Sequence, residues 1–156
     1  ELEKNVSLGT GTFVKSKTEK AKIDIWFSLE NVKKGEKHSC AIELKYFKKA
    51  NHREPNNRYD VFKDIHNIER YGDFVDAGFV LVATDHAHYI NQQDFSQDTK
   101  DFDFREGQNY RAGTELVYRT QNPYGPPIIL KGSYDFAWRT VEAGLSFLFV
   151  PVEPCK

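Results

Sequence analysis

The sequence lacks the features that mark membrane, secreted and zinc-ribbon proteins. It has only two cysteines, Cys40 and Cys155, which are far apart and fit no Cys-x-x-Cys or Cys/His spacing. This excludes a disulfide framework and a zinc ribbon. No stretch approaches the roughly 18 consecutive apolar residues of a membrane span, and no signal peptide is visible. We therefore expect a cytoplasmic protein that has no membrane segment.

The sequence also lacks a large excess of charge of either sign. Its 22 Lys and Arg residues nearly balance its 23 Asp and Glu residues, so the formal net charge is -1. Proteins that coat nucleic acid through bulk electrostatics usually carry a large basic excess, and this class is disfavoured. A local basic segment remains, because lysines are concentrated between Lys33 and Arg53.

Apolar residues, by contrast, are present in sufficient number for one folded domain. The chain has 156 residues, is 39% hydrophobic, and contains 12 Phe and 8 Tyr. We therefore expect one globular domain over residues 1–156. The chain begins with Glu1 and contains no Met, which indicates a fragment, a processed product or a sequence with residues omitted. Its first structural element can therefore be missing.

Periodic patterns predict an α/β or α+β domain with few helices. Gly72 is expected to end the main helix, and a polar loop is expected over residues 48–58. The continuously apolar residues 77–84 are typical of a central strand that is covered on both faces. The expected elements are strands at 2–6, 21–29, 39–47, 77–84, 115–119, 128–131 and 145–152, and a helix at 59–71.

Three residues on neighbouring expected strands form a candidate catalytic group. Glu43 and Lys45 share one face of the strand at 39–47, beside the strand that carries Asp24. Two carboxylates and a backbone carbonyl suit Mg²⁺, which prefers oxygen ligands at about 2.1 Å and keeps several waters. The metal lowers the pKa of a bound water and neutralises charge at phosphorus, while an ammonium orients or stabilises the nucleophile.

A Glu-x-Lys triplet also has an ordinary explanation. At about 6% abundance for each residue type, it occurs by chance in a chain of this length about half of the time. In that interpretation Glu43 and Lys45 form an ion pair on a solvated face, worth under about 1 kcal/mol. The position of Asp24 favours a site, because a solvated charge would be poorly placed within an apolar strand.

The order of these elements resembles the core of the PD-(D/E)XK, or restriction endonuclease-like, superfamily, and more closely an uncharacterised bacterial branch of it. The resemblance covers roughly residues 21–84 well and the C-terminal half loosely. It implies a restriction endonuclease-like α/β core with a central mixed β-sheet flanked by few helices. The residues that carry it are Ile23-Asp24-Ile25-Trp26, Ala41-Ile42-Glu43-Leu44-Lys45-Tyr46, Arg58-Tyr59-Asp60-Val61-Phe62-Lys63-Asp64-Ile65 and Ile68-Glu69-Arg70.

This resemblance also implies a function and its residues. Asp24 and Glu43 would be metal ligands for Mg²⁺ or Mn²⁺, the Leu44 carbonyl a third ligand, and Lys45 the catalytic lysine. The activity would be hydrolysis of phosphodiester bonds, with DNA as the favoured partner. Nucleases that cut both strands are often dimers, so a homodimer is compatible with this function. The alternative is a nuclease-like domain without catalysis that serves in binding or assembly within a defence or repair system.

The sequence departs from the superfamily pattern in two places. The family core usually opens with a helix, and this chain starts too late to show one. Ile23, rather than Pro, precedes Asp24.

Auxiliary candidates lie on the expected helix and in the basic loop before it. Lys63 and Asp64 lie where this superfamily often keeps an auxiliary residue; otherwise they belong to a solvated face. The basic residues Lys48, Lys49, Arg53 and Arg58 suit contacts to nucleic acid, or else form a solvated loop.

A histidine pair gives one further candidate. Asp85, His86 and His88 directly follow a strand and could bind zinc, but no third nitrogen or sulfur ligand has a suitable spacing. An exposed histidine pair is therefore favoured over a zinc site.

Overall fold

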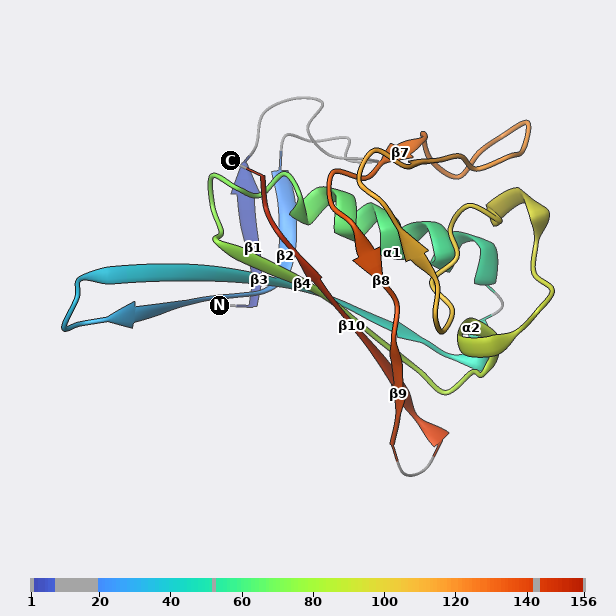
Figure 1. Ribbon diagram of the computed structural model, residues 1–156, viewed down its shortest axis with the longest axis horizontal. Coiled ribbons are helices and arrows are strands. Elements are labelled where there is room, and N and C mark those ends of the chain that lie inside the picture. Colours follow the sequence, from blue (N-terminus) through green and yellow to red (C-terminus); the bar gives the residue numbers. More distant parts are fainter. Residues whose placement is uncertain (1, 8–19, 52, 142–143, 156) are drawn as a thin grey trace.

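A six-stranded mixed sheet forms the centre of the computed structural model, which describes residues 2–7, 20–51, 53–141 and 144–155 (Figure 1). Strands β3 and β4 are parallel, and all other neighbouring strands are antiparallel. This confirms the mixed α/β class. In spatial order the strands are β1 (Leu2–Ser7), β2 (Lys20–Asn31), β3 (Glu36–Phe47), β4 (Ala77–Thr84), β10 (Ser146–Val152) and β9 (Trp138–Thr140).

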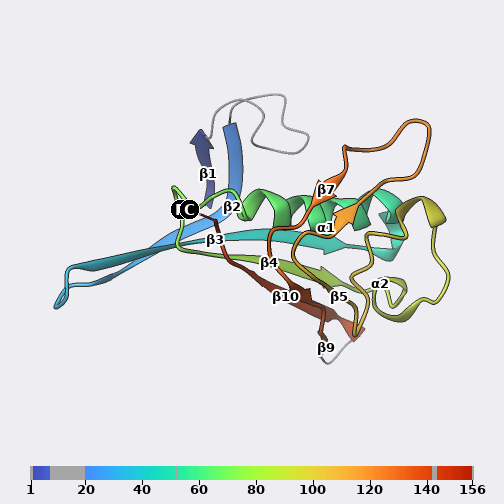
Figure 2. The same cartoon turned by 45° about the horizontal axis from the view of Figure 1, so that its top comes forward.

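Strands β2 and β3 form a long hairpin that projects from the rest of the sheet (Figure 1). Its tight turn uses Gly35 at a φ of 66°, a conformation that glycine adopts without a steric penalty. Direct pairing of the two strands ends at Ile25 with Ile42, where β2 separates from β3 and continues its pairing with β1. Figure 2 shows β1 and the first part of β2 standing up from the sheet. The main chain of β3 beyond Ile42 is therefore not covered by a β2 ladder.

Helix α1 (Glu54–Ile68) makes the crossover between the parallel strands β3 and β4. It begins at Glu54, so the polar loop expected over residues 48–58 is wrong, and only the short 3-10 helix η1 (Lys49–Asn51) and a few residues precede α1. Pro55 fits the first turn because the N–H that it lacks would have no partner there. On one side α1 packs on the sheet through Ile68, which lies against Gly78 of β4, and on another side Phe62 contacts aromatic rings of the C-terminal half.

The C-terminal half of the chain covers the sides of α1 that the sheet leaves free (Figure 2). The buried carboxylate of Glu69 connects the two parts, because it accepts hydrogen bonds of 2.8 Å from the N–H groups of Lys131 and Gly132 and one of 2.7 Å from the Tyr134 hydroxyl. Among the described residues of the whole chain, no helix is sufficiently long and apolar to cross a membrane. The short elements of this half are α2 (His88–Asn91), η2 (Gln97–Thr99), β5 (Asn109–Tyr110), β6 (Glu115–Leu116), β7 (Ile128–Ile129) and β8 (Tyr134–Asp135), with β5 paired to β8 and β6 to β7.

The face of the sheet opposite α1 is largely exposed. Residues of β4 alternate between buried and half-buried. The expectation that β4 is central in the sheet is therefore confirmed, and the expectation that both of its faces are covered is wrong. On the open face Leu44 is 40% exposed and Phe149 52% exposed. Glu43 and Lys45 lie on the opposite face of β3, towards α1. The polar pair is therefore covered, and the apolar side chains beside it are exposed.

Candidate active site

The three residues expected to be catalytic lie together where β2 separates from β3. Asp24 Oδ2 accepts a hydrogen bond of 2.8 Å from the backbone N–H of Leu44. A side-chain hydrogen bond also joins Asp24 to Glu43. Lys45 follows two residues later on the same face of β3, and its charge acts directly on Glu43. The alternating strand pattern thus placed these three side chains correctly relative to one another.

Helix α1 brings both auxiliary candidates into the same place. Lys45 Nζ forms an ion pair with Asp64 Oδ2. Lys63 Nζ lies 3.4 Å from Asp64 Oδ1 and 3.4 Å from Asp60 Oδ1. The Asp64 side chain is only 5% exposed, so it does not belong to a solvated face. We call Asp24, Glu43 and Asp64, together with Lys45 and Lys63, the carboxylate cluster.

One residue of the site was not expected from the sequence. The Tyr71 hydroxyl donates a hydrogen bond of 3.3 Å to Glu43 Oε1, and Tyr71 is almost fully buried. Burial raises the pKa of Tyr71, and the charge of Glu43 raises it further, so the hydroxyl remains a neutral donor. Tyr71 follows the helix and is 28 residues from Glu43 in sequence, and no local pattern indicates this contact.

The electrostatics of the cluster depend on its burial. Burial raises the pKa of Glu43 to about 8, together with the negative charges of Asp64 and Asp24, while Lys45 acts in the opposite direction. Burial alone would lower the pKa of Lys45, but the charge and hydrogen bond of Asp64 outweigh it and raise that pKa. At neutral pH the cluster therefore holds a charged ammonium and a protonated Glu43. A cation bound between the carboxyl groups would relieve their mutual repulsion.

The oxygen donors of the cluster suit a hard divalent cation. The N–H and C=O of one strand residue point to the same edge, so the Leu44 carbonyl is directed to the side where its N–H meets Asp24. Within the described ranges, no group of three or more His, Cys, Asp or Glu side chains is arranged to hold a metal ion. A metal site here would therefore combine Asp24, Glu43, the Leu44 carbonyl and water, a set that Mg²⁺ accepts.

Arg58 is not available to nucleic acid, contrary to the expectation from the sequence. Its side chain is fully buried and forms an ion pair with Glu54. The guanidinium carbon, Cζ, lies 3.9 Å from the ring centre of Phe95. The reason is the early start of α1, which makes residue 58 part of the buried side of the helix. The other candidate residues for nucleic-acid contact, Lys48, Lys49 and Arg53, are exposed near the ends of β3 and β4.

The histidine pair after β4 shows no zinc-binding arrangement. The rings of His86 and His88 stack with their centres 5.2 Å apart, and His88 Nε2 lies 3.3 Å from Glu54 Oε1. Asp85 Oδ1 accepts a hydrogen bond of 3.0 Å from the backbone N–H of Lys49. In this part of the described chain, too, no three-ligand group forms.

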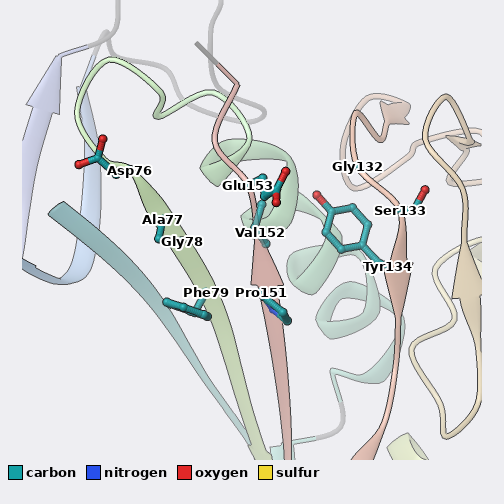
Figure 3. Close-up of a pocket in the computed structure, with 10 residues that line it drawn as sticks. All are labelled: Asp76, Ala77, Gly78, Phe79, Gly132, Ser133, Tyr134, Pro151, Val152 and Glu153. Atoms are coloured by element: carbon teal, nitrogen blue, oxygen red, sulfur yellow. The ribbon is translucent and has the colours of Figure 1, made fainter. Parts of the chain in front are cut away.

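A cavity of about 440 Å³ lies apart from the carboxylate cluster, between the start of β4 and the end of β10 (Figure 3). Phe79 and Pro151 contribute apolar walls, and Tyr134 of β8 points towards the end of β10. The Asp76 carboxylate at its rim accepts a hydrogen bond of 2.9 Å from the backbone N–H of Ser39. None of the residues expected to be catalytic lines this cavity.

Comparison of the chain with protein-family models, with curated proteins and with solved structures found no match. Any function assigned to the chain therefore rests on the geometry of the carboxylate cluster.

Proposed function

We propose that the protein hydrolyses phosphodiester bonds in nucleic acid with Mg²⁺ or Mn²⁺ held by Asp24 and Glu43. The observation that carries this proposal is the convergence of three carboxyl groups on Lys45 in a covered place. The cluster holds three carboxyl groups for the two ammonium groups of Lys45 and Lys63, and a surplus buried acid costs stability. Groups with strongly perturbed pKa values tend to gather at functional sites. The preference for DNA over RNA follows from the resemblance to the PD-(D/E)XK superfamily.

Asp24, Glu43 and Lys45 have separate tasks in this reaction. A bound Mg²⁺ would supply a water of lowered pKa and positive charge beside the phosphate. The Leu44 N–H fixes the carboxylate of Asp24, and the Tyr71 hydroxyl fixes that of Glu43. Lys45 stays charged, and its ammonium would act on a phosphate oxygen or on the attacking water.

Metal binding is the first test. Calorimetric titration with Mg²⁺ and Mn²⁺ should give saturable binding to the wild type that is lost in Asp24→Asn and in Glu43→Gln. The exposed Glu36→Gln, on the same strand as Glu43, is the matched control and should bind as the wild type does. Equal binding by the wild type and both site variants would sink the metal-site assignment.

Cleavage is the second test. Plasmid DNA, single-stranded DNA and RNA should be incubated with each metal and with wild type, Lys45→Ala or the exposed control Lys37→Ala. We expect loss of at least about a hundredfold in rate for Lys45→Ala, the scale of removing one transition-state contact, and no loss for Lys37→Ala. Equal cleavage by wild type and Lys45→Ala would show that the activity comes from another site or another protein.

A second candidate is a nuclease-like module that binds but does not cleave. The ion pair of Lys45 with Asp64 favours this alternative, because it engages the ammonium that the reaction needs. Such a module would bind DNA or RNA and leave every substrate intact with either metal. Asp64→Asn separates the two candidates, since releasing Lys45 would alter the cleavage rate of an enzyme and change nothing in a module that does not cleave.

A further inference from the structure

Another cavity, of about 300 Å³, opens beyond the ends of the parallel strands β3 and β4. In α/β sheets ligands commonly bind at the carboxyl ends of parallel strands. At about 3.3 Å per residue, Phe47 at the end of β3 lies about 13 Å from Glu43, so this cavity is separate from the carboxylate cluster. We call it the strand-end pocket, and the residues of its lining that matter here are Lys48, Lys49, Arg53, Glu54, His86 and His88.

Positive charge predominates in the strand-end pocket. Lys48, Lys49 and Arg53 are exposed at its wall. Glu54 is the acid of its lining, and the charge of its carboxylate is compensated by the buried guanidinium of Arg58. The neighbouring carboxylate of Asp85 binds the backbone N–H of Lys49. Among the described residues, the cationic side chains of the pocket therefore outnumber the carboxylates of its lining.

The start of α1 adds to this positive potential. Arg53 is the N-cap residue, and no side chain caps the first turn of this 15-residue helix. Backbone N–H groups and the helix dipole at such an end attract anions. Burial lowers the pKa of His86, and the charges of His88 and Lys49 lower it further, while Asp85 and Glu54 act in the opposite direction.

We propose that the strand-end pocket binds a phosphate group. Lys48, Lys49 and Arg53 supply charge-assisted hydrogen bonds, and His86 and His88 of the same lining supply ring N–H groups. That this phosphate belongs to the nucleic acid being cut rests on the proposed function. Measured along the axis of a duplex, about 13 Å corresponds to about four base-pair steps at 3.4 Å per step. A phosphate held in the pocket would therefore set the position of the cut relative to itself.

The binding test uses inorganic phosphate and does not depend on cleavage. Titration followed by ¹H–¹⁵N NMR should shift the amide signals of residues 48–54 and 85–88 saturably in the wild type. Lys49→Ala/Arg53→Ala should weaken binding at least about tenfold, because two charged contacts are removed. Lys33→Ala/Lys34→Ala removes the same charge at the exposed hairpin turn and should change the affinity for phosphate less than about twofold. Absence of saturable shifts in the wild type, or equal weakening in both double variants, would overturn the proposal.

Oligonucleotides identify the source of the phosphate. Strands of one sequence with a 5′-phosphate, a 3′-phosphate or free hydroxyl ends are compared for binding to the wild type and to Lys49→Ala/Arg53→Ala. Tighter binding of one phosphorylated end, lost in the variant, assigns the pocket to that end; equal weakening for all strands assigns it to an internal phosphate. Binding that the variant leaves intact for every strand contradicts the assignment to nucleic acid.

Failure of the proposed function is visible separately. Wild-type protein that binds inorganic phosphate in the strand-end pocket but cleaves no substrate would remove the hydrolysis proposal and leave the phosphate site. Cleavage that depends on Lys45 without any phosphate binding would remove the phosphate site and leave the hydrolysis proposal.

Discussion

We expect Glu43→Gln to stabilise the metal-free protein, by an amount that increases from pH 5 to pH 8. In the folded protein burial, with the charges of Asp64 and Asp24, raises the pKa of Glu43 from its ordinary value of 4.5 to about 8. Between these two values the folded protein holds a proton that the unfolded chain releases. Stability therefore falls as the pH rises through this window. Gln has nearly the same shape and remains neutral, so it does not carry this cost.

The pKa of Glu43 sets an upper bound on the gain. A rise from 4.5 to about 8 corresponds to roughly 4–5 kcal/mol at pH 8 and above. The amide must still be desolvated, and it replaces only part of the hydrogen bonding with Asp24 and Tyr71, so we expect a net gain of about 1–2 kcal/mol. For a domain of this size 1 kcal/mol shifts Tm by about 2–4 °C. Tm should therefore rise by about 2–8 °C at pH 8, and it should not rise at pH 5, where the gain linked to the pKa is below about 1 kcal/mol and the costs of the amide remain.

Thermal unfolding followed by circular dichroism at pH 5, 7 and 8, with a chelator present, measures this gain. Addition of Mg²⁺ should then raise the Tm of the wild type, because the ligand binds only the folded state, and should leave Glu43→Gln unchanged. The exposed Glu36→Gln should follow the wild type in both conditions. A Glu43→Gln protein less stable than the wild type at pH 8 would refute the reasoning, since it would mean that Glu43 stabilises the fold through its ionised form.

Three further predictions concern the support of the site. Glu69→Ala removes the acceptor of three hydrogen bonds and should cost about 3–5 kcal/mol of unfolding free energy in urea titrations; a loss below about 1 kcal/mol would contradict this role. Burial lowers the pKa of His66 to about 4, so the unfolded chain takes up a proton first as the pH falls below about 6.5, and the contribution of His66 to stability should decline from there to pH 4, opposite in sign to that of Glu43; a His66→Gln protein whose stability changes with pH as that of the wild type does would show that His66 is not responsible. Gly125→Ala would place a methyl group against the Tyr59 ring and should lower Tm by about 3–9 °C, from an overpacking cost of about 1–3 kcal/mol; an unchanged Tm would mean that the loop moves freely.

The relative placement of Asp24, Glu43 and Lys45 could be predicted because it depends on local periodicity. Side chains two apart share a strand face, and a polar segment between two alternating runs indicates a hairpin. The start of α1 could not be predicted in this way. Residues 54–58 are polar except for Pro55, and Arg58 is buried only because Glu54 and several aromatic rings surround it.

Contacts between distant parts of the chain were also beyond local patterns. The burial of β4 depends on what lies over each face of the sheet, and an apolar sequence is the same whether one face or both are covered. Glu69 meets the Tyr134 hydroxyl across 65 residues, and the Tyr71 hydroxyl meets Glu43 across 28. Such pairs form only when the helix and the C-terminal half are already in place.

The carboxylate cluster and Tyr71 come from one continuous stretch, which runs from Asp24, where β2 separates from β3, to Tyr71, just beyond the end of the crossover helix. The hairpin and the helix of this stretch bring every member of the carboxylate cluster together, and the second half of the chain supplies none. During synthesis the residues of the cluster are thus made first, and the remainder adds the strands β4, β9 and β10 and the cover attached through Glu69. Mutation can exchange or reshape that cover over evolutionary time without replacing a residue of the carboxylate cluster.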